Sequence, residues 1–406
     1  MLKKNISLII LILSMISCCE TQLEERTGTG SELKIKPILN EETQSVKDSA
    51  KVEMICIDFP DNIGYDSIVV GEDYEKVTAT KKVFPYKLAK YELSYNVWRI
   101  VYKWATSTER GNKIYKFENP GAEGSYKTSK SGNSVLFNEG GDAKTEGMPV
   151  TGISWRDAMV WCNAFSEMCK LTPVYYTDAA FSEPIRNAVY EAGKQITNMP
   201  LPYSDLAKDV DMTSLTMGNV DNPYVNKNAN GWRLPYDYEW EYAARKCKDG
   251  TFISGANAPG DASGIVESSS GEPTLLEQIQ GITEKKESSK VLKDYGWSYE
   301  NSNLAGSNPT AAGWDDSTPV SGMTGYRMHK QGGKKPTDLG FYDMAGNAYE
   351  WQFDYGADYD WKYEIHPSRA LRGHTYEWAN YYFAAAKRYT CPPYVKMGGI
   401  RLARNF

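Results

Sequence analysis

Thiols and imidazoles, the side chains most often used for redox, nucleophilic or metal chemistry, are few and scattered in this chain. After the first 19 residues they are Cys56, Cys162, Cys169, Cys247 and Cys391, with His329, His366 and His374. No CxxC pair is present, and the histidines lack the spacing of zinc ligands. Cys162 and Cys169 fall on one predicted helix, about 10 Å apart, beyond the ~7 Å Cα separation that a disulfide tolerates. The thiols predict neither a zinc centre nor a disulfide framework, and their odd number leaves at least one free or joined to another chain.

Aromatic and mixed polar side chains crowd the segment from about residue 370 to 404. Tyr and Trp give a binding surface a large contact area at a low cost in conformational entropy. The segment therefore predicts a ligand-binding surface. Its candidate residues are His374, Tyr376, Glu377, Trp378, Asn380, Tyr382, Tyr389, Thr390, Cys391, Pro393, Tyr394, Val395, Lys396 and Met397.

The even-numbered residues between 374 and 382 are expected to share one face. If this stretch is a strand, successive side chains alternate, so the odd-numbered residues point into the core. We expect the even-numbered face to be exposed, with Trp378, Tyr376 and Tyr382 contributing most of the binding energy. The alternative is that these aromatic side chains belong to the core.

The first helix expected behind this segment starts near residue 94. Ser94 is a plausible N-cap, and Val97, Trp98, Val101 and Ala105 recur at helical spacing.

Two further helices are predicted downstream. Ser154 and Asp157 have the N-cap and N3 spacing of a capping box at the start of the second. The third is expected over residues 231–245, with Pro235 in its first turn and acidic residues after it. Residues 106–148, 170–230 and 252–335 show little periodicity and are predicted to be loops.

The first 19 residues are interpreted as a secretory signal. A basic start is followed by 11 apolar-rich residues, Ile6 to Ile16, too few to cross ~30 Å of hydrocarbon as a helix. Cys18 then follows a small residue, as in a bacterial lipoprotein signal, and is the expected lipidated residue. Cys19 leaves the cleavage point open by one position, and an ordinary secreted protein is the alternative.

Residues 20–50 are polar and charged, and we expect a flexible tether because such a segment cannot bury enough apolar surface to order itself. The folded domain is then expected over 51–406. The chain is 13% aromatic and carries a net charge of −6. An acidic surface without a basic cluster argues against a nucleic-acid partner.

Three motifs together resemble the formylglycine-generating enzyme family, also called sulfatase-modifying factors. They are GFYDMAGNAYEW at Gly340–Trp351, RGHTYEWANYYF at Arg372–Phe383 and GIRLA at Gly399–Ala403. The RLPYDYEWEYA run at Arg233–Ala243 fits as well, although Tyr236 and Asp237 replace the family's Thr and first Glu. The resemblance covers about residues 80–406. It implies one α+β domain with a C-type-lectin-like fold, short sheets flanked by two main helices and many loops.

Enzymes of this family oxidise a substrate cysteine at a copper ion held by two thiolates, the soft ligands that Cu(I) requires. From Arg369 to Phe406 the chain has one thiol, Cys391, placed in a Thr-Cys-Pro-Pro turn. Trp378 and Phe383 stand where the resemblance aligns the thiolate pair. The sequence therefore predicts no catalytic residues, and the alternative function is a metal-dependent oxidase or formylglycine-type enzyme.

The terminal segment is similar to that of the variable proteins of diversity-generating retroelements, which share this fold and include surface-displayed lipoproteins of treponemes. This likeness implies a segment at about 370–404 whose codons are rewritten by mutagenic reverse transcription. Combined with Cys18, it implies a monomeric, lipid-anchored protein of the bacterial outer membrane that binds a protein or cell-surface ligand.

The family also places a calcium ion at the Gly-Asn-x-x-Glu turn, which implies Asn347 and Glu350 as ligands here, although a second family calcium site has no clear match. Calcium would be structural, and no other cofactor is expected. The alternative is a tight turn in which Asn347 adopts a left-handed conformation and Glu350 pairs with an arginine. A calcium-dependent lectin is a further alternative, but no Glu-Pro-Asn or Trp-Asn-Asp sugar-binding motif is present.

Overall fold

The computed structural model divides the chain into two units, Met1–Ile35 and Lys36–Phe406. The structure describes residues 34–47, 50–75, 78–127, 133–189, 217–262, 266–267, 288–289, 292–302, 309–310, 313–314, 325–356, 368–378 and 383–406. The predicted signal segment and Cys18 lie outside these ranges. Within them, no helix is long and apolar enough to cross a membrane.

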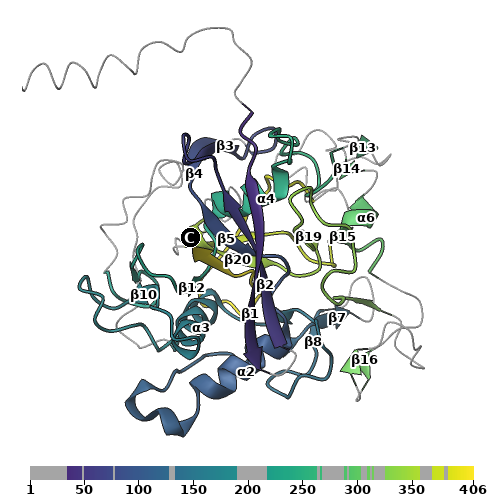
Figure 1. The fold of residues 1–406 in the computed structure, drawn as a ribbon. Coiled ribbons are helices and arrows are strands. Elements are labelled where there is room, and N and C mark those ends of the chain that lie inside the picture. Colours follow the sequence, from purple (N-terminus) through teal and green to yellow (C-terminus); the bar gives the residue numbers. More distant parts are fainter. Residues whose placement is uncertain are drawn as a thin grey trace, which may run out of the picture. The chain divides into compact units, whose positions relative to one another are not determined.

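The second unit is built around a five-stranded antiparallel sheet in the order β1-β2-β5-β23-β12 (Figure 1). The strands are β1 (Ile38–Lys47), β2 (Ala50–Asp58), β5 (Tyr86–Ala89), β23 (Ala403–Asn405) and β12 (Trp232–Arg233). The last strand of the chain, β23, lies between β5 and β12 and so fixes the end of the terminal segment inside the sheet.

Strand β1 corrects the predicted tether. It pairs with β2 along its whole length, from Ile38 opposite Asp58 to Lys47 opposite Ala50, so the tether expected over residues 20–50 is wrong for 38–47. Its side chains are exposed or half-buried, and the strand is held by its backbone ladder and by ion pairs of Glu41 and Glu42 with Lys90, Lys87 and Arg404. A polar edge strand of this kind gives little hydrophobic pattern for a sequence to reveal.

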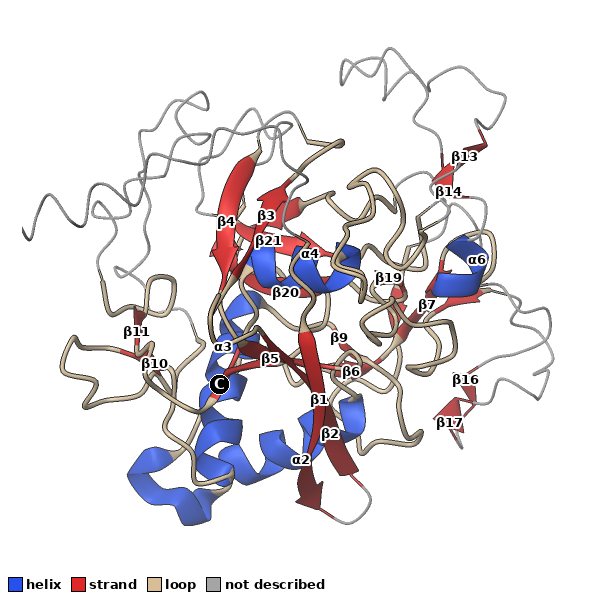
Figure 2. Cartoon of the chain, turned by 45° about the horizontal axis from the view of Figure 1, so that its top comes forward, coloured by secondary structure: helices blue, strands red, loops and turns tan. Residues whose placement is uncertain are grey.

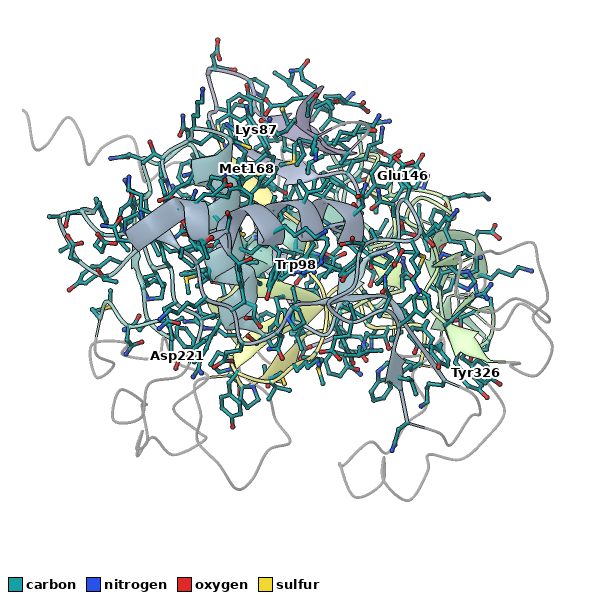
Figure 3. All side chains as sticks on the ribbon, turned by 90° about the horizontal axis from the view of Figure 1, so that it is seen from below. Lys87, Trp98, Glu146, Met168, Asp221 and Tyr326 are labelled. Carbon is teal, nitrogen blue, oxygen red and sulfur yellow. The ribbon has the colours of Figure 1, made fainter. Side chains whose placement is uncertain are left out.

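Helices α2 (Tyr95–Ala105) and α3 (Trp155–Met168) confirm the two predicted caps. Ser94 accepts a hydrogen bond from the Val97 N–H, and Ser154 forms the capping box with Asp157. The helices meet through Trp98 and Trp161, whose rings stack at 5.4 Å and 5°. Trp98 is fully buried in the interior of the unit (Figure 3).

Helix α4 (Asp237–Arg245) begins six residues after the predicted start at residue 231, because residues 232 and 233 belong to strand β12. The Tyr236 N–H donates to Glu239 at 2.8 Å and begins the helix. Figure 2 shows α4 beside strands β3 (Asp66–Val70) and β4 (Ala79–Val83), with α2 and α3 at the other end of the unit.

Two three-stranded sheets lie closer to the terminal segment. One has the order β20-β21-β22 and contains β20 (Glu350–Tyr355), β21 (Arg369–Arg372) and β22 (Tyr389–Cys391). The other has the order β18-β7-β8 and contains β18 (Tyr326–Arg327), β7 (Ser125–Lys127) and β8 (Val135–Leu136).

The remaining elements are a 3-10 helix, one short α-helix and pairs of two-residue strands. They are η1 (Thr108–Lys113), β6 (Ala122–Glu123), β9 (Val150–Thr151), β10 (Tyr175–Tyr176), β11 (Tyr224–Val225), β13 (Val266–Glu267), β14 (Ser288–Ser289), α6 (Leu292–Tyr295), β15 (Gly296–Trp297), β16 (Pro309–Thr310), β17 (Gly313–Trp314) and β19 (Ala345–Gly346). These short strands, joined by long loops, confirm the expected α+β class.

Candidate ligand-binding face

The terminal segment leaves strand β21 through a sharp turn. Gly373 and His374 both have positive φ angles, of 84° and 66°, a conformation that ends an extended strand. The Trp378 N–H then donates to the Thr375 carbonyl at 3.1 Å and closes a second turn. The strand predicted from residue 374 is therefore wrong over its described part, and side-chain alternation does not apply there.

Arg372 anchors the start and the middle of the segment. Its guanidinium donates to both carboxylate oxygens of Asp237 at 2.6 and 2.8 Å and to Glu241 at 2.8 Å. It also donates to the carbonyls of Ala385 and Lys387, each at 3.2 Å. Arg372 is fully buried. Because Asp237 and Glu241 belong to helix α4, these bonds attach the segment to that helix.

A buried aromatic cluster fills the space beneath the segment. The His374 ring lies 4.1 Å from that of Tyr389, 5.3 Å from Phe383, 5.7 Å from Tyr349 and 5.8 Å from Trp378. Burial, together with the charge of Lys387, lowers the pKa of His374 well below its ordinary value. His374 is therefore a neutral packing residue at neutral pH.

Four of the predicted binding residues are buried. They are His374, Tyr376, Cys391 and Pro393. The expectation of an exposed face is therefore wrong for His374 and Tyr376, and burial leaves Cys391 and Pro393 little surface for a ligand. The Tyr376 hydroxyl shares hydrogen bonds with Ser125 at 3.2 Å and Ser134 at 3.0 Å. The alternative of core aromatics holds for this part of the segment.

The other described candidates reach the surface. Tyr394 and Met397 are 38% and 37% exposed, Lys396 is exposed, and the half-buried members are Glu377, Trp378, Tyr389, Thr390 and Val395. Asn380 and Tyr382 lie outside the described residues. The exposed candidates thus gather in the loop between β22 and β23.

Strand β8 lies beside residues 376–377 and beside Lys396 of the terminal segment. Its residues fell in the loop predicted over 106–148. Ser134, which precedes β8, contacts Tyr376 and Glu377. A side chain built at Gly152 would meet Leu136 at 2.8 Å and Lys396 at 3.4 Å, so both adjoin the same backbone position. The apolar run from Val135 to Phe137 is the sequence signal that could have identified this strand.

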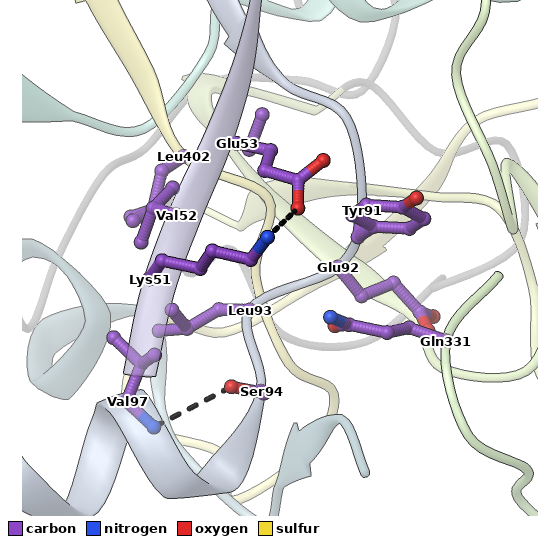
Figure 4. A pocket seen from close by; sticks show the side chains of 11 residues that line it. Lys51, Val52, Glu53, Tyr91, Glu92, Leu93, Ser94, Val97, Gln331 and Leu402 are labelled. Carbon is purple, nitrogen blue, oxygen red and sulfur yellow. Dashed lines mark hydrogen bonds and ion pairs between the residues drawn. The ribbon is translucent and has the colours of Figure 1, made fainter. Parts of the chain in front are cut away.

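A separate pocket lies between strand β2 and the loop before α2 (Figure 4). It measures about 280 Å³ including its open mouth, and an ion pair of 2.7 Å joins Lys51 to Glu53 at its rim. Glu92 lines it but is 3% exposed and accepts hydrogen bonds from Asn347 at 2.7 Å and the Ala348 N–H at 2.9 Å. This carboxyl group serves the turn at residue 347 rather than the pocket.

Asn347 and Glu350 do not fit the implied calcium site. Asn347 has a φ of 62°, accepts from the His329 N–H at 2.8 Å and donates to the His329 carbonyl. Glu350 pairs with Arg401 at 2.6 Å and accepts from the Trp240 indole at 2.6 Å. The expected ligands are instead internal partners, as in the alternative of a tight turn.

A neighbouring carboxyl group, that of Asp343, predicts a pH-dependent stability. Burial raises its pKa to about 6, although the Gly332 N–H and Arg401 oppose this. A folded pKa above the unfolded value of about 3.9 means that its stabilising effect is complete below pH ~4 and is lost as the pH rises through ~6. We expect Asp343→Asn to flatten this part of the stability profile, by on the order of 1–3 kcal/mol. Urea unfolding between pH 4 and 7 would measure it, and an unchanged profile would contradict the assignment.

The thiols described in the structure are all free. Cys391 is the last residue of strand β22. It does not lie in the turn that the two following prolines suggested. Burial raises the pKa of Cys391 to about 11, so its thiol is protonated at neutral pH. A single protonated thiol does not fit a copper site that requires two thiolates.

Comparison with known proteins identifies a matching family and similar proteins. The family model of the sulfatase-modifying factor enzyme 1-like domain matches residues 66–406. The chaperone protein LppX of Paenibacillus barcinonensis is 26% identical over 243 residues, which are 59% of this chain and 61% of that protein; the chain therefore matches less than two thirds of this relative's length.

Two solved structures are similar to this chain, and the first of them shares its fold. Variable protein 1 of Treponema denticola has a TM-score of 0.50 at 21% identity, covering 90% of this chain and 99% of that one. The structure of CarF has a TM-score of 0.49 at 20% identity, covering 87% and 98%.

Proposed function

The chain belongs to the family of sulfatase-modifying factor enzyme 1-like domains, and on this premise we propose that it uses the family's scaffold to bind a ligand without catalysing a reaction. The ligand contacts the exposed part of the terminal segment. A formylglycine-type oxidase remains the alternative function.

One observation carries the proposal: large side chains are displayed on a loop that is fixed at both ends. Tyr394, Lys396 and Met397 are exposed, whereas the backbone at residues 393 and 397 is hydrogen-bonded to the core. The Arg156 N–H donates to the Pro393 carbonyl at 3.3 Å, and the Met397 N–H donates to the Ile153 carbonyl at 3.1 Å. A preorganised loop with aromatic and aliphatic side chains binds with little loss of conformational entropy.

The donor set argues against oxidation. The resemblance aligns Trp378 and Phe383 with the thiolate pair, and both pack around His374. Cys391 is the remaining thiol after Arg369. The aromatic rings that stand in place of the two thiolates supply a packed surface and no soft ligand for Cu(I).

The test of this point is a direct assay of the alternative. The purified protein is incubated with Cu(I), O₂ and a cysteine-containing sulfatase peptide, and the peptide is followed by mass spectrometry. We expect no formylglycine and no stoichiometric copper; conversion of the peptide would overturn the proposal. The double variant Trp378→Cys with Phe383→Cys controls for the ability of the scaffold to bind copper.

We further propose that the protein is anchored by a lipid on Cys18 at the outer membrane surface and that residues 370–404 are diversified by a retroelement. The lipoprotein-type signal supports the first point, and the aromatic, partly exposed terminal segment supports the second. Labelled palmitate should enter the wild-type protein and a Cys19→Ser variant but not Cys18→Ser. Labelling of Cys18→Ser would show that the lipid is attached to a residue other than Cys18.

A further inference from the structure

We propose that one end of the five-stranded sheet, where Phe84 and Phe406 are exposed, rests on the phospholipid bilayer that carries the protein. The inference depends on the proposed lipid anchor at Cys18. It assigns a membrane as the partner of a surface outside the terminal segment, and it gives the ligand-binding face a direction away from that membrane.

Four neighbouring strands start or end together at this end of the sheet. Strand β1 begins at Ile38, opposite Asp58 at the end of β2. Strand β5 begins at Tyr86, which lies opposite the last but one residue of β2 and opposite Asn405, the last residue of β23. Phe406 follows β23 directly, so it lies beside the residues that precede β5 (Figure 1).

Phe84 and Phe406 are the most exposed large apolar side chains among the described residues, at 57% and 59%. Phe84 stands just before β5, and its ring lies 5.8 Å from that of Tyr65. The Lys82 Nζ atom is 4.3 Å from the centre of the Tyr65 ring, and the Lys87 Nζ atom is 5.6 Å from that of Phe406. The exposed rings and the amines around them therefore form one surface.

We call this surface the sheet-end patch, and its members are Tyr65, Lys81, Lys82, Phe84 and Phe406. Lys81 and Lys82 are exposed on strand β4. At a membrane surface, phenyl rings enter the boundary between headgroups and acyl chains, and lysine ammonium groups attract anionic lipid headgroups. The patch therefore combines the two features of a surface that binds a bilayer.

The start of β1 ties this end of the sheet to the proposed anchor. Positions 18 and 38 are 20 residues apart, and a coil of that length spans about 25 Å on average. A globular domain of about 370 residues is about 50 Å across. Phe406 lies three strand spacings from β1, or about 14 Å. An anchor at Cys18 therefore keeps the sheet-end patch closer to the bilayer than the opposite side of the domain.

The ligand-binding loop lies away from the patch. The Arg156 guanidinium is 5.6 Å from the centre of the Tyr394 ring and is bonded to Asp221 at 2.7 Å. Figure 3 shows Asp221 and Lys87, which adjoins Phe406, toward opposite sides of the unit. Contact between the patch and the bilayer therefore directs Tyr394 outward. Because the patch contains no residue of the terminal segment, diversification of that segment leaves the contact unchanged.

The experiment uses the full lipidated protein in vesicles of phosphatidylethanolamine and phosphatidylglycerol. The variants carry photoreactive benzoylphenylalanine in place of Phe84, of Phe406 or, as the matched control, of Tyr394, an aromatic residue that is 38% exposed. After irradiation, mass spectrometry measures the fraction of the protein that is joined to phospholipid. Thermal melts establish that each variant is folded, and palmitate labelling establishes that it is anchored.

We expect lipid adducts at positions 84 and 406 and only background at position 394. With the probe at position 406, Phe84→Ser should lower the lipid adduct by about tenfold, because burial of one phenylalanine changes a partition equilibrium by that order. Phe181→Ser, which removes an exposed ring in the loop after β10, should leave the adduct unchanged. Equal adducts at all three positions, no adduct at any of them, or adducts with a second copy of the chain in place of lipid would overturn the membrane contact. Loss of palmitate labelling would instead count against the proposed anchor.

Discussion

Replacing Arg372 with methionine is expected to lower the free energy of unfolding by about 3–5 kcal/mol, the usual cost of removing one partner of a buried ion pair. Arg372 and Glu241 are fully buried, and Asp237 is 7% exposed. Burial alone would raise the pKa of Asp237, but Arg372 and Arg388 lower it below its ordinary value. The variant would leave two carboxylates in the interior and would release the carbonyls of Ala385 and Lys387. Chemical denaturation of the purified variants measures this loss.

The matched control is Lys335→Met, which removes an exposed pair with Asp294 of 3.0 Å. Such surface pairs contribute about 0–1 kcal/mol. If Arg372→Met were no more destabilising than this control, Arg372 would not anchor the terminal segment.

Replacing Arg401 with methionine is the second change with a large expected effect, again about 3–5 kcal/mol. The Arg401 guanidinium contacts Glu350 at 2.6 Å and donates to the carbonyls of Ala89 at 3.0 Å and Tyr342 at 2.8 Å. Both charged side chains are fully buried. Removing the cation leaves Glu350 uncompensated beneath the turn that carries Asn347.

A double variant separates charge from packing. Adding Glu350→Gln to Arg401→Met removes the uncompensated carboxylate, so the double variant should be more stable than Arg401→Met alone. Because the cation of this turn is the guanidinium, millimolar calcium should not rescue Arg401→Met, and a chelator should leave the wild-type melting temperature unchanged. Rescue by calcium, or loss of stability with chelator, would restore the metal interpretation of Asn347 and Glu350.

Local sequence signals predicted the elements that hold the face. Ser94, Ser154 and Asp157 identified two helix starts because a cap is a contact between residues three positions apart. The pair of Arg372 with Asp237 escaped prediction, and the arginine expected beside Glu350 in the alternative of a tight turn could not be named, for the opposite reason. Arg372 and Asp237 are separated by 135 positions, and Arg401 and Glu350 by 51, so their pairing appears only when the fold brings them together.

The exposed set was predicted only in part because alternation was applied across a turn. Gly373 was the available warning, since a glycine at the end of a short strand favours a left-handed turn. Phe383 is in the core, as its odd number predicted. Strand β8 was missed because its one signal, the apolar run from Val135 to Phe137, is too short to show a period within a long polar segment.

We propose that the exposed residues of the terminal segment are diversified and that the buried ones are fixed. The DNA sequence around the locus is the direct test. We predict a near-repeat of the codons for residues 370–404 beside a reverse-transcriptase gene, differing at adenines in the codons of Tyr394, Lys396 and Met397 but not in that of Phe383. Absence of such a repeat, or differences confined to buried positions, would contradict the claim and leave a binding protein of fixed specificity.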